Sequence, residues 1–408
     1  MLARVRRLAP FVLALVLAPA ALAQVLPQPE GARSLEVVEA GATIRAAPSS
    51  HAPRRGTVRV GTRLPFERRV TGLGCPGGEW YRLGEEQYIC ESLVVPRDEE
   101  PAGDEVPVVR AGELLPRQYA FVGTDGTWAY SRPTDYFQEE YVESLGRGFG
   151  LAITDVRTVG GVTFLRSLSG LWVADDDVRH ARGSDFAGVD LSGGAPLDVA
   201  WAVRGGAALR AWNGRRAGSV VRRLGAREVV HVLEDVGRGL VRVEGGVIAA
   251  RELHRPTLSA PPPEVGATER WIDVEIASQT LVAYEGATPV FATLVSTGRA
   301  GESHATPLGT FRIWVKLAED TMDDLDRTDQ ESNYAIEAVP WVQYFQEGVA
   351  LHAAFWHDQF GTRRSHGCVN LAPRDARRLF GWTAPQLPRG WDAILTTATQ
   401  PGTVVRVR

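Results

Sequence analysis

Two proline-rich segments divide this chain and limit the size of any folded unit within it. Residues 96–107 read PRDEEPAGDEVP and residues 256–263 read PTLSAPPP. Segments of this composition run extended and connect domains. The chain has 408 residues, which is more than one ordinary domain. We therefore predict folded domains over 35–96, 111–190, 197–255 and 270–408, with linkers over 97–110 and 256–269.

The segments before residue 256 contain a loose internal repeat of short strands and glycine-rich turns. One copy runs from Gly41 to Val94 and another from Gly206 to Leu253. Short alternating runs between such turns predict small β-barrels. The order of the pieces resembles bacterial SH3-like domains. A third, more divergent SH3-like copy is predicted over 111–190.

The three cysteines separate into a candidate pair and one remaining thiol. Cys75 and Cys90 flank an aromatic stretch, as if on the two arms of a hairpin, whereas Cys368 lies far along the chain. A disulfide between the first two would close a loop of about 15 residues and contribute roughly 3 kcal/mol. Two unpaired core thiols are the alternative, because the sequence does not show how close their Cβ atoms are. The odd cysteine, Cys368, then needs a separate explanation.

Residues 1–23 have the features of a secretory signal peptide. Three arginines precede an apolar run, and the segment ends in Ala21-Leu22-Ala23, a small-x-small cleavage pattern. We predict cleavage before Gln24, no transmembrane anchor afterwards, and a periplasmic or cell-wall-associated protein. An uncleaved membrane anchor is the alternative, although the apolar run is short for a bilayer. The chain has 45 basic and 49 acidic residues, which argues against a nucleic-acid partner.

Residues 270–408 are also predicted to be mainly β. The expected strands are Trp271–Ile276, Thr280–Tyr284, Val290–Ser296, Thr310–Val315, Tyr334–Val339 and Val349–Ala353. One short helix is predicted to begin at Pro373 with Asp375 in its first turn. Arg377 and Arg378 are expected in its last turn, and Gly381 is expected to stop it.

The residues around Cys368 have the composition of a nucleophilic site. The sequence reads Ser365-His366-Gly367-Cys368-Val369-Asn370, and His352 lies upstream at the end of a predicted strand. A thiol attacks as the thiolate, and a nearby imidazole can take its proton. Glycine before the nucleophile allows a sharp turn, whose backbone amides can face an oxyanion. The pattern predicts a cysteine acyltransferase. The alternatives are an inert buried thiol and a structural strand histidine.

His352 followed by this six-residue sequence resembles the signature of YkuD-type L,D-transpeptidase catalytic domains. Segments upstream fit the same family in the expected order, at Gln279–Tyr284, Val295–Gly298 and Thr306–Ile313. The resemblance covers residues 270–408 and implies a β-sandwich or barrel with a short helix. Two features depart from the family. Only 12 residues (353–364) separate His352 from Ser365, and Ala353 stands where glycine or serine is common.

What the resemblance implies is a reaction on peptidoglycan. Cys368 would attack the carbonyl between the third and fourth residues of a stem peptide and release D-alanine, with His352 as its base. The amides of His366, Gly367 and Cys368 would form the oxyanion hole. Ser365, His366 and Asn370 would shape the site, and His366 is equally well explained by catalysis or by structural hydrogen bonding. An amine of a second stem peptide would then resolve the thioester and give a 3→3 cross-link.

Three further side chains are candidates for substrate binding. Arg363 and Arg364 precede the motif and could bind stem-peptide carboxylates, although solvated loop charges explain them equally well. Tyr344 stands where the family often has an aromatic residue in the cleft, and core packing is the alternative. The spacing of His304, His357 and Cys368 follows no zinc pattern, so no metal or cofactor is expected.

Several functions stay open at this point. Water as acceptor would make the protein an L,D-carboxypeptidase, and a protein amine would make it an attachment enzyme. A catalytically inactive wall-binding scaffold is the alternative from another class, against which the intact Cys368 and His352 argue. The SH3-like modules would position the enzyme on the wall or act only as spacers.

Overall fold

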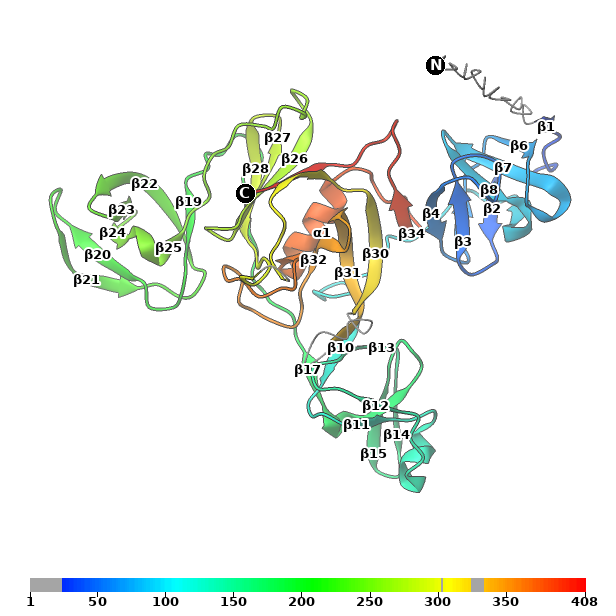
Figure 1. The fold of residues 1–408 in the computed structure, drawn as a ribbon, viewed down its shortest axis with the longest axis horizontal. Coiled ribbons are helices and arrows are strands. Elements are labelled where there is room, and N and C mark those ends of the chain that lie inside the picture. Colours follow the sequence, from blue (N-terminus) through cyan, green and yellow to red (C-terminus); the bar gives the residue numbers. More distant parts are fainter. Residues whose placement is uncertain (1–23, 302–303, 324–333) are drawn as a thin grey trace, which may run out of the picture.

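The structure is a computed structural model that describes residues 24–301, 304–323 and 334–408. The predicted signal peptide at 1–23 lies outside the described residues. A C-terminal unit occupies the centre, and three small β units surround it (Figure 1). Strands make up most of the regular structure and the described residues contain one α-helix, so the predicted mainly β fold class is confirmed. No helix in this part of the chain is long and apolar enough to cross a membrane.

The N-terminal β unit has its core around Leu35, Ile44 and Tyr81. Cys75 and Cys90 form a disulfide with their Cα atoms 5.6 Å apart. The strands of this unit are β1 (Val25–Leu26), β2 (Ser34–Val37), β3 (Ala42–Arg45), β4 (Arg54–Val58), β5 (Arg63–Leu64), β6 (Arg68–Thr71), β7 (Glu79–Gly84), β8 (Gln87–Cys90) and β9 (Val94–Arg97).

The middle and third β units follow in sequence. The middle β unit contains β10 (Gln118–Val122), β11 (Thr127–Ala129), β12 (Glu143–Leu145), β13 (Gly150–Ile153), β14 (Asp155–Val159), β15 (Val162–Arg166), β16 (Trp172–Ala174) and β17 (Val178–Ala181). The third β unit contains β19 (Val199–Ala202), β20 (Ala208–Trp212), β21 (Ala217–Arg223), β22 (Val229–Gly237), β23 (Leu240–Val243), β24 (Gly246–Ala249) and β25 (Leu253–His254).

All three small units end in the same local arrangement. A single 3₁₀ turn separates the last two strands in each of them, at Glu91–Leu93, Asp175–Asp177 and Ala250–Glu252. Each turn follows directly on a strand and leads directly into the next one. This common ending supports the hypothesis that the middle β unit is a divergent copy of the other two, which stays a prediction.

The C-terminal unit is built from two sheets and a helix. Its strands are β26 (Arg270–Glu275), β27 (Thr280–Glu285), β28 (Thr288–Leu294), β29 (Gly309–Arg312), β30 (Val315–Asp323), β31 (Ala335–Gln346), β32 (Val349–Ala353), β33 (Val369–Leu371), β34 (Trp391–Leu395) and β35 (Val404–Val407). One sheet has the order β18-β28-β27-β26-β35-β29, where β18 is Val189–Asp190, and the other runs β34-β30-β31-β32-β33. Apolar side chains from both sheets, among them Val274, Leu281, Trp341 and Leu351, form one core.

The strand predictions for this unit need two corrections. The segment Thr310–Val315 is not one strand, because the chain leaves one sheet after β29 and enters the other at β30. The strand predicted at Tyr334–Val339 extends to Gln346 and includes Pro340. A proline inside a run argues against a strand in sequence reasoning. Here β31 accommodates it at an irregularity, where Ala338 and Trp341 have positive φ values of 50° and 58°.

Helix α1 (Pro373–Trp382) begins at the predicted proline and has Asp375 in its first turn. The prediction of its end is wrong. The helix continues through Gly381 to Trp382. Arg377 and Arg378 therefore lie in its middle, and its last turn contains no basic residue.

A lysine from strand β30 bonds to the C-terminal end of helix α1. Lys316 of β30 is fully buried, and its Nζ donates to the carbonyl oxygens of Phe380 at 2.6 Å and Thr383 at 3.0 Å. Burial lowers the pKa of Lys316 to about 7, and its two hydrogen bonds satisfy helix carbonyls that have no partner in the next turn. A contact over such a sequence separation leaves no local sequence signal.

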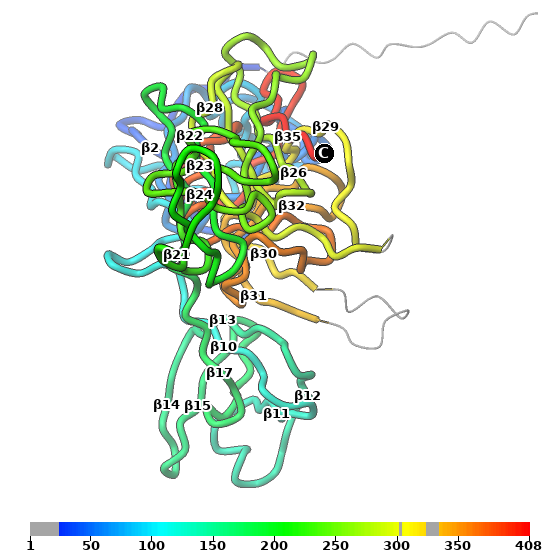
Figure 2. The backbone as a smooth tube through the Cα atoms, turned by 90° about the vertical axis from the view of Figure 1, so that its left-hand side faces the viewer, coloured from blue at the N-terminus to red at the C-terminus, as the bar shows by residue number. Residues whose placement is uncertain are grey.

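Two of the three small units, the N-terminal and the middle β unit, are joined to the C-terminal unit through strand pairing. Strand β4 pairs antiparallel with β34, with Gly56 opposite Ile394. A Cβ atom on Gly56 would lie 2.1 Å from the carbonyl oxygen of Ala393, so this pairing requires glycine. Strand β13 pairs with β31 at Gly150 and Ile336. Figures 1 and 2 both show the middle β unit against the end of β30 and β31.

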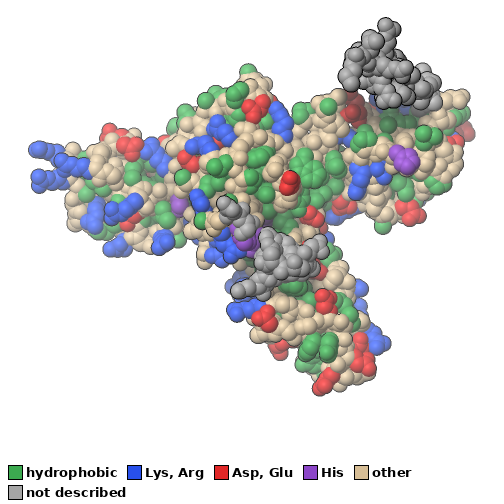
Figure 3. Space-filling model, in the orientation of Figure 1, with side chains coloured by type: hydrophobic (Ala, Val, Ile, Leu, Met, Phe, Trp, Pro, Cys, Tyr) green, Lys and Arg blue, Asp and Glu red, His purple; other side chains and the backbone are tan. Residues whose placement is uncertain are grey.

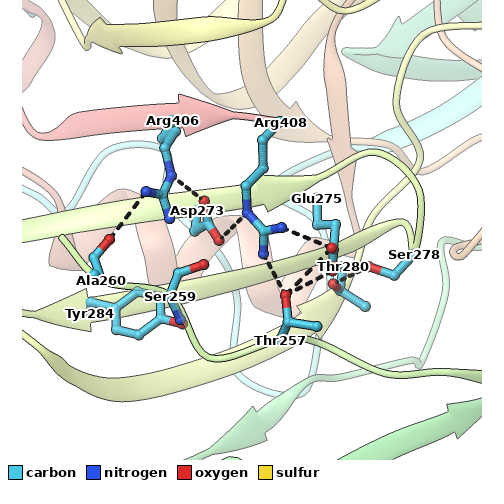
Figure 4. Close-up of polar contacts among 10 residues, drawn as sticks. All are labelled: Thr257, Ser259, Ala260, Asp273, Glu275, Ser278, Thr280, Tyr284, Arg406 and Arg408. Atoms are coloured by element: carbon cyan, nitrogen blue, oxygen red, sulfur yellow. Dashed lines mark hydrogen bonds and ion pairs between the residues drawn. The ribbon is translucent and has the colours of Figure 1, made fainter. Parts of the chain in front are cut away.

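The second predicted linker lies along the first sheet of the C-terminal unit (Figure 4). Asp273 is only 2% exposed and accepts from Nε of Arg406 at 2.7 Å and Nε of Arg408 at 3.0 Å. The same two arginines donate to the linker, Arg406 to the carbonyl of Ala260 at 3.1 Å and Arg408 to the hydroxyl of Thr257 at 2.6 Å. One buried carboxylate therefore orients both guanidinium groups that hold the linker.

Candidate active site

Cys368 lies at the end of a tight turn that leads into β33. Gly367 has a φ of 128°, a conformation that side chains disfavour, so glycine here is a backbone requirement. Ser365 Oγ donates to the carbonyl oxygen of Cys368 at 2.5 Å and accepts from the Gly367 amide at 3.1 Å. Thr306 Oγ1 donates to the Gly367 carbonyl at 2.7 Å. Two hydroxyl groups therefore fix the turn.

These contacts change the expected oxyanion hole. The sequence suggested three amide donors, including that of Gly367. The Gly367 amide already donates to Ser365 Oγ, so it supports the turn rather than facing a substrate. The oxyanion role of the amides of His366 and Cys368 stays a prediction.

His352 is buried in β32, opposite Asn370 of β33. Its Nδ1 lies 3.0 Å from the carbonyl oxygen of Ala353. A carbonyl only accepts, so Nδ1 carries the proton and the lone pair is on Nε2. Burial lowers the pKa of His352 to about 4. The imidazole is therefore neutral near pH 7 and able to accept a proton.

The Cys368 thiol is also neutral in this structure. Its Sγ lies 3.7 Å from the carbonyl oxygen of Gly348. Burial raises the pKa of the Cys368 thiol to about 11, because desolvation disfavours the thiolate. Cys368, His352 and Asn370 line the same cleft. The cleft therefore holds a thiol and an imidazole, both of which burial keeps neutral.

A cleft of about 210 Å³ brings most of the predicted site residues together. It contains Cys368, His352, Ser365, His366, Asn370 and Arg364 from the sequence prediction, and further side chains that include Ile336, Trp356 and His357. The cleft is bordered by the β30–β31 arm on one side and by residues 354–364 on the other.

Two of the predicted substrate-binding residues do not line this cleft. The hydroxyl of Tyr344 donates to Asp320 Oδ2 at 2.7 Å, and burial raises the pKa of Tyr344. Arg363 is exposed outside the cleft. Arg364 does line it, with Nη1 donating to Gln359 Oε1 at 2.5 Å. Substrate contacts by these three residues stay predictions.

His366 lies at the mouth of the cleft. Its ring stacks on Tyr334 with centroids 4.9 Å apart. Its Nε2 contacts the guanidinium of Arg299, and because arginine only donates, this nitrogen is the acceptor of that contact. The role of His366, in catalysis or in structural hydrogen bonding, stays a prediction.

Sequence reasoning missed Trp356 and His357. The Trp356 ring stacks against His352 with centroids 5.7 Å apart. His357 Nε2 lies 3.1 Å from the amide nitrogen of Asn370. Burial, followed by the charge of Arg364, lowers the pKa of His357 to about 4. The sequence offered one signal for these two residues: a tryptophan followed by a histidine within the short interval between His352 and Ser365.

Comparison with known proteins agrees with this geometry. Residues 269–407 match the family model of the L,D-transpeptidase catalytic domain, YkuD. A putative L,D-transpeptidase of Bacillus subtilis strain 168, YciB, is 25% identical over 146 residues, which cover 33% of this chain and 69% of that protein.

Similar solved structures are L,D-transpeptidases. A crystal structure of a mutant L,D-transpeptidase of Enterococcus faecium is 22% identical, with a TM-score of 0.28, and covers 41% of this chain. The matched region spans 56% of the Enterococcus chain. The L,D-transpeptidase of Stackebrandtia nassauensis is 27% identical, with a TM-score of 0.25, over 36% of this chain and 58% of its own. Residues 269–407 of the present chain are a YkuD-type L,D-transpeptidase catalytic domain.

Proposed function

We propose that the protein is an exported L,D-transpeptidase that cross-links peptidoglycan stem peptides through a Cys368 thioester. The observation that carries the proposal is the placement of Cys368 and His352 in one cleft, within a domain of this family. The substrate class follows from the family, and the fixed tautomer of His352 supports its role as base.

The first half-reaction would form the thioester. The Cys368 proton passes to Nε2 of His352 as Sγ attacks the carbonyl carbon between the third and fourth residues of a tetrapeptide stem. The carbonyl oxygen becomes an oxyanion, which the amides of His366 and Cys368 would stabilise. When the intermediate collapses, the C–N bond breaks and the His352 imidazolium returns the proton to the leaving nitrogen. D-alanine leaves, and the stem remains on sulfur.

The second half-reaction would regenerate the thiol. An amine of a second stem attacks the thioester carbonyl, and His352 takes the proton that the amine loses. The C–S bond then breaks, an amide forms, and the proton returns to Sγ. Water in place of the amine would give hydrolysis. The carbonyl of Ala353 keeps the imidazole in one tautomer through both halves.

Mass spectrometry of muropeptide products tests this function. The protein without residues 1–23 is incubated with disaccharide tetrapeptides beside Cys368→Ala. A 3→3 dimer together with free D-alanine supports transpeptidation. D-alanine without a dimer indicates an L,D-carboxypeptidase. No product, together with no carbapenem adduct on Cys368, contradicts the enzyme proposal.

A further inference from the structure

We propose that Arg227, which lies in the third β unit and outside the catalytic domain, is a positioning residue for the active site. It holds Asp358, and through Asp358 the cleft wall formed by residues 354–364. The inference deepens the function proposed above, because its main readout is acyl transfer at Cys368.

Asp358 is held almost entirely from outside the catalytic domain. Nη2 of Arg227 lies 2.5 Å from Asp358 Oδ2, and Nη1 donates to the Asp358 backbone carbonyl. Ser184, in the segment between the middle and third β units, donates through Oγ to Asp358 Oδ1. One residue of the cleft wall thus has both carboxylate oxygens and its carbonyl oxygen occupied by two residues that precede the domain.

The backbone of Arg227 is held in a costly conformation. Its φ is 58°, in the left-handed region that non-glycine residues rarely adopt. Such conformations cost on the order of 1 kcal/mol and persist where surrounding contacts hold them. The side chain of Arg227 is 19% exposed, compared with 56% for Asp358. The arginine is therefore anchored and the aspartate is the partner that it fixes.

Apolar side chains pack around the arginine of this ion pair. Phe186 stacks against Phe360 of the cleft wall with ring centroids 6.0 Å apart, and the Arg227 guanidinium lies 5.7 Å from the Phe186 ring. Trp201 of the third β unit shares a buried cluster with Phe360. Exposed ion pairs contribute little because water screens them. A two-point contact by a largely buried arginine is stronger and fixes orientation as well.

The wall that Arg227 holds presents His357 to the cleft. His357 directly precedes Asp358 and lines the cleft with Cys368. Within the catalytic domain, Ser296 Oγ donates to the carbonyl of the next residue, Gln359, at 3.1 Å, and backbone amides at both ends of the wall, those of Ala354 and Arg364, donate to neighbouring strands and loops. Loss of Arg227 would therefore loosen the wall at Asp358, next to His357, while these attachments and the Ser184 bond stay.

The test uses the full chain with Arg227→Ala. We expect kcat/KM for D-alanine release to fall about tenfold, since small displacements at a reacting centre cost large factors in rate. Arg227→Lys restores one of the two contacts and should recover part of the loss. In an Asp358→Asn background, Arg227→Ala should cause a smaller further loss than in the parent, because the contact to the carboxylate is already gone and only the contact to the backbone carbonyl remains to be removed.

Arg242→Ala is the matched control. Arg242 belongs to the same unit and pairs with Glu234 at 2.6 Å, with both side chains well exposed. It lines the outer pocket of that unit with Arg215 and Arg238, and basic side chains gather at this outer end of the molecule (Figure 3). We expect parent activity from this variant.

Three results would overturn the inference: parent activity in Arg227→Ala, equal losses in Arg227→Ala and Arg242→Ala, or additive losses with Asp358→Asn. If the parent itself releases no D-alanine, the proposed function fails instead. The inference is then decided by hydrogen exchange of the backbone amides in 354–364. Faster exchange in Arg227→Ala than in Arg242→Ala supports it, and equal exchange refutes it.

Discussion

The protonation state of Cys368 leads to a quantitative prediction for its reaction with iodoacetamide. With a thiol pKa of about 11, only about 3 in 10,000 molecules carry the thiolate near pH 7.5, whereas about 9 in 100 free cysteines do, at a pKa of about 8.5. That difference is about 300-fold. A more basic thiolate is intrinsically more nucleophilic, so the rate constant of the Cys368 thiolate should exceed that of a free cysteine thiolate by a factor of about 13. We expect Cys368 to react about 20 times more slowly than free cysteine.

The rate of this alkylation should also rise about tenfold per pH unit up to about pH 10, because the thiolate fraction does. The adduct is measured by intact mass on the non-reduced protein, in which Cys75 and Cys90 are bonded to each other. Cys368→Ala controls for other sites of alkylation. A rate that levels off below about pH 9 would show that a thiolate–imidazolium pair already exists in the resting protein, and would refute the reasoning from burial.

Three further outcomes follow from contacts in the structure. Asp273→Asn should lower the free energy of unfolding by about 2–4 kcal/mol, because it leaves the partly buried guanidinium of Arg406 without a carboxylate and that of Arg408 with Glu275 alone. Glu234→Gln, at an exposed pair, should change it by less than about 0.5 kcal/mol in the same denaturant titration. Gly56→Ala should separate the N-terminal β unit from the catalytic domain, seen as an increased radius of gyration in X-ray scattering. An unchanged profile would contradict that reading of the close approach. Thr306→Val should lower kcat for D-alanine release about tenfold or more with little change in melting temperature, since the turn before Cys368 loses the hydroxyl that bonds to the Gly367 carbonyl. Parent activity in this variant would show that the turn does not need the Thr306 hydroxyl.

The chemistry of the site could be predicted from sequence because it is local. Ser365 to Asn370 are contiguous, and His352 lies on the neighbouring strand of one sheet, so the motif and its spacing contain most of the geometry. The bond from the Gly367 amide to Ser365 could not be predicted, because it depends on how the turn closes. The sequence shows only that a turn is present.

Contacts between distant segments could not be predicted in this way. Arg227 and Asp358 are 131 residues apart, and nothing around either residue indicates the other. The same holds for Lys316, whose amino group bonds to the C-terminal carbonyls of a helix that begins 57 positions later in the chain. The second part of β31 was not predicted, because prolines are rare inside strands and Pro340 therefore indicated that the strand ends. The irregular stretch around Pro340 accommodates it.

The pairing of β4 with β34 has a consequence for any attempt to isolate the catalytic domain. Strand β34 lies between β4 and β30, so cutting the chain before residue 269 would leave its outer edge without a hydrogen-bonding partner. That edge carries Trp391 and Ile394, which are both buried in the whole protein. Unpaired apolar edges recruit strands from other chains. We therefore expect a protein shortened to the catalytic domain to self-associate through this edge, for a reason unrelated to its active site.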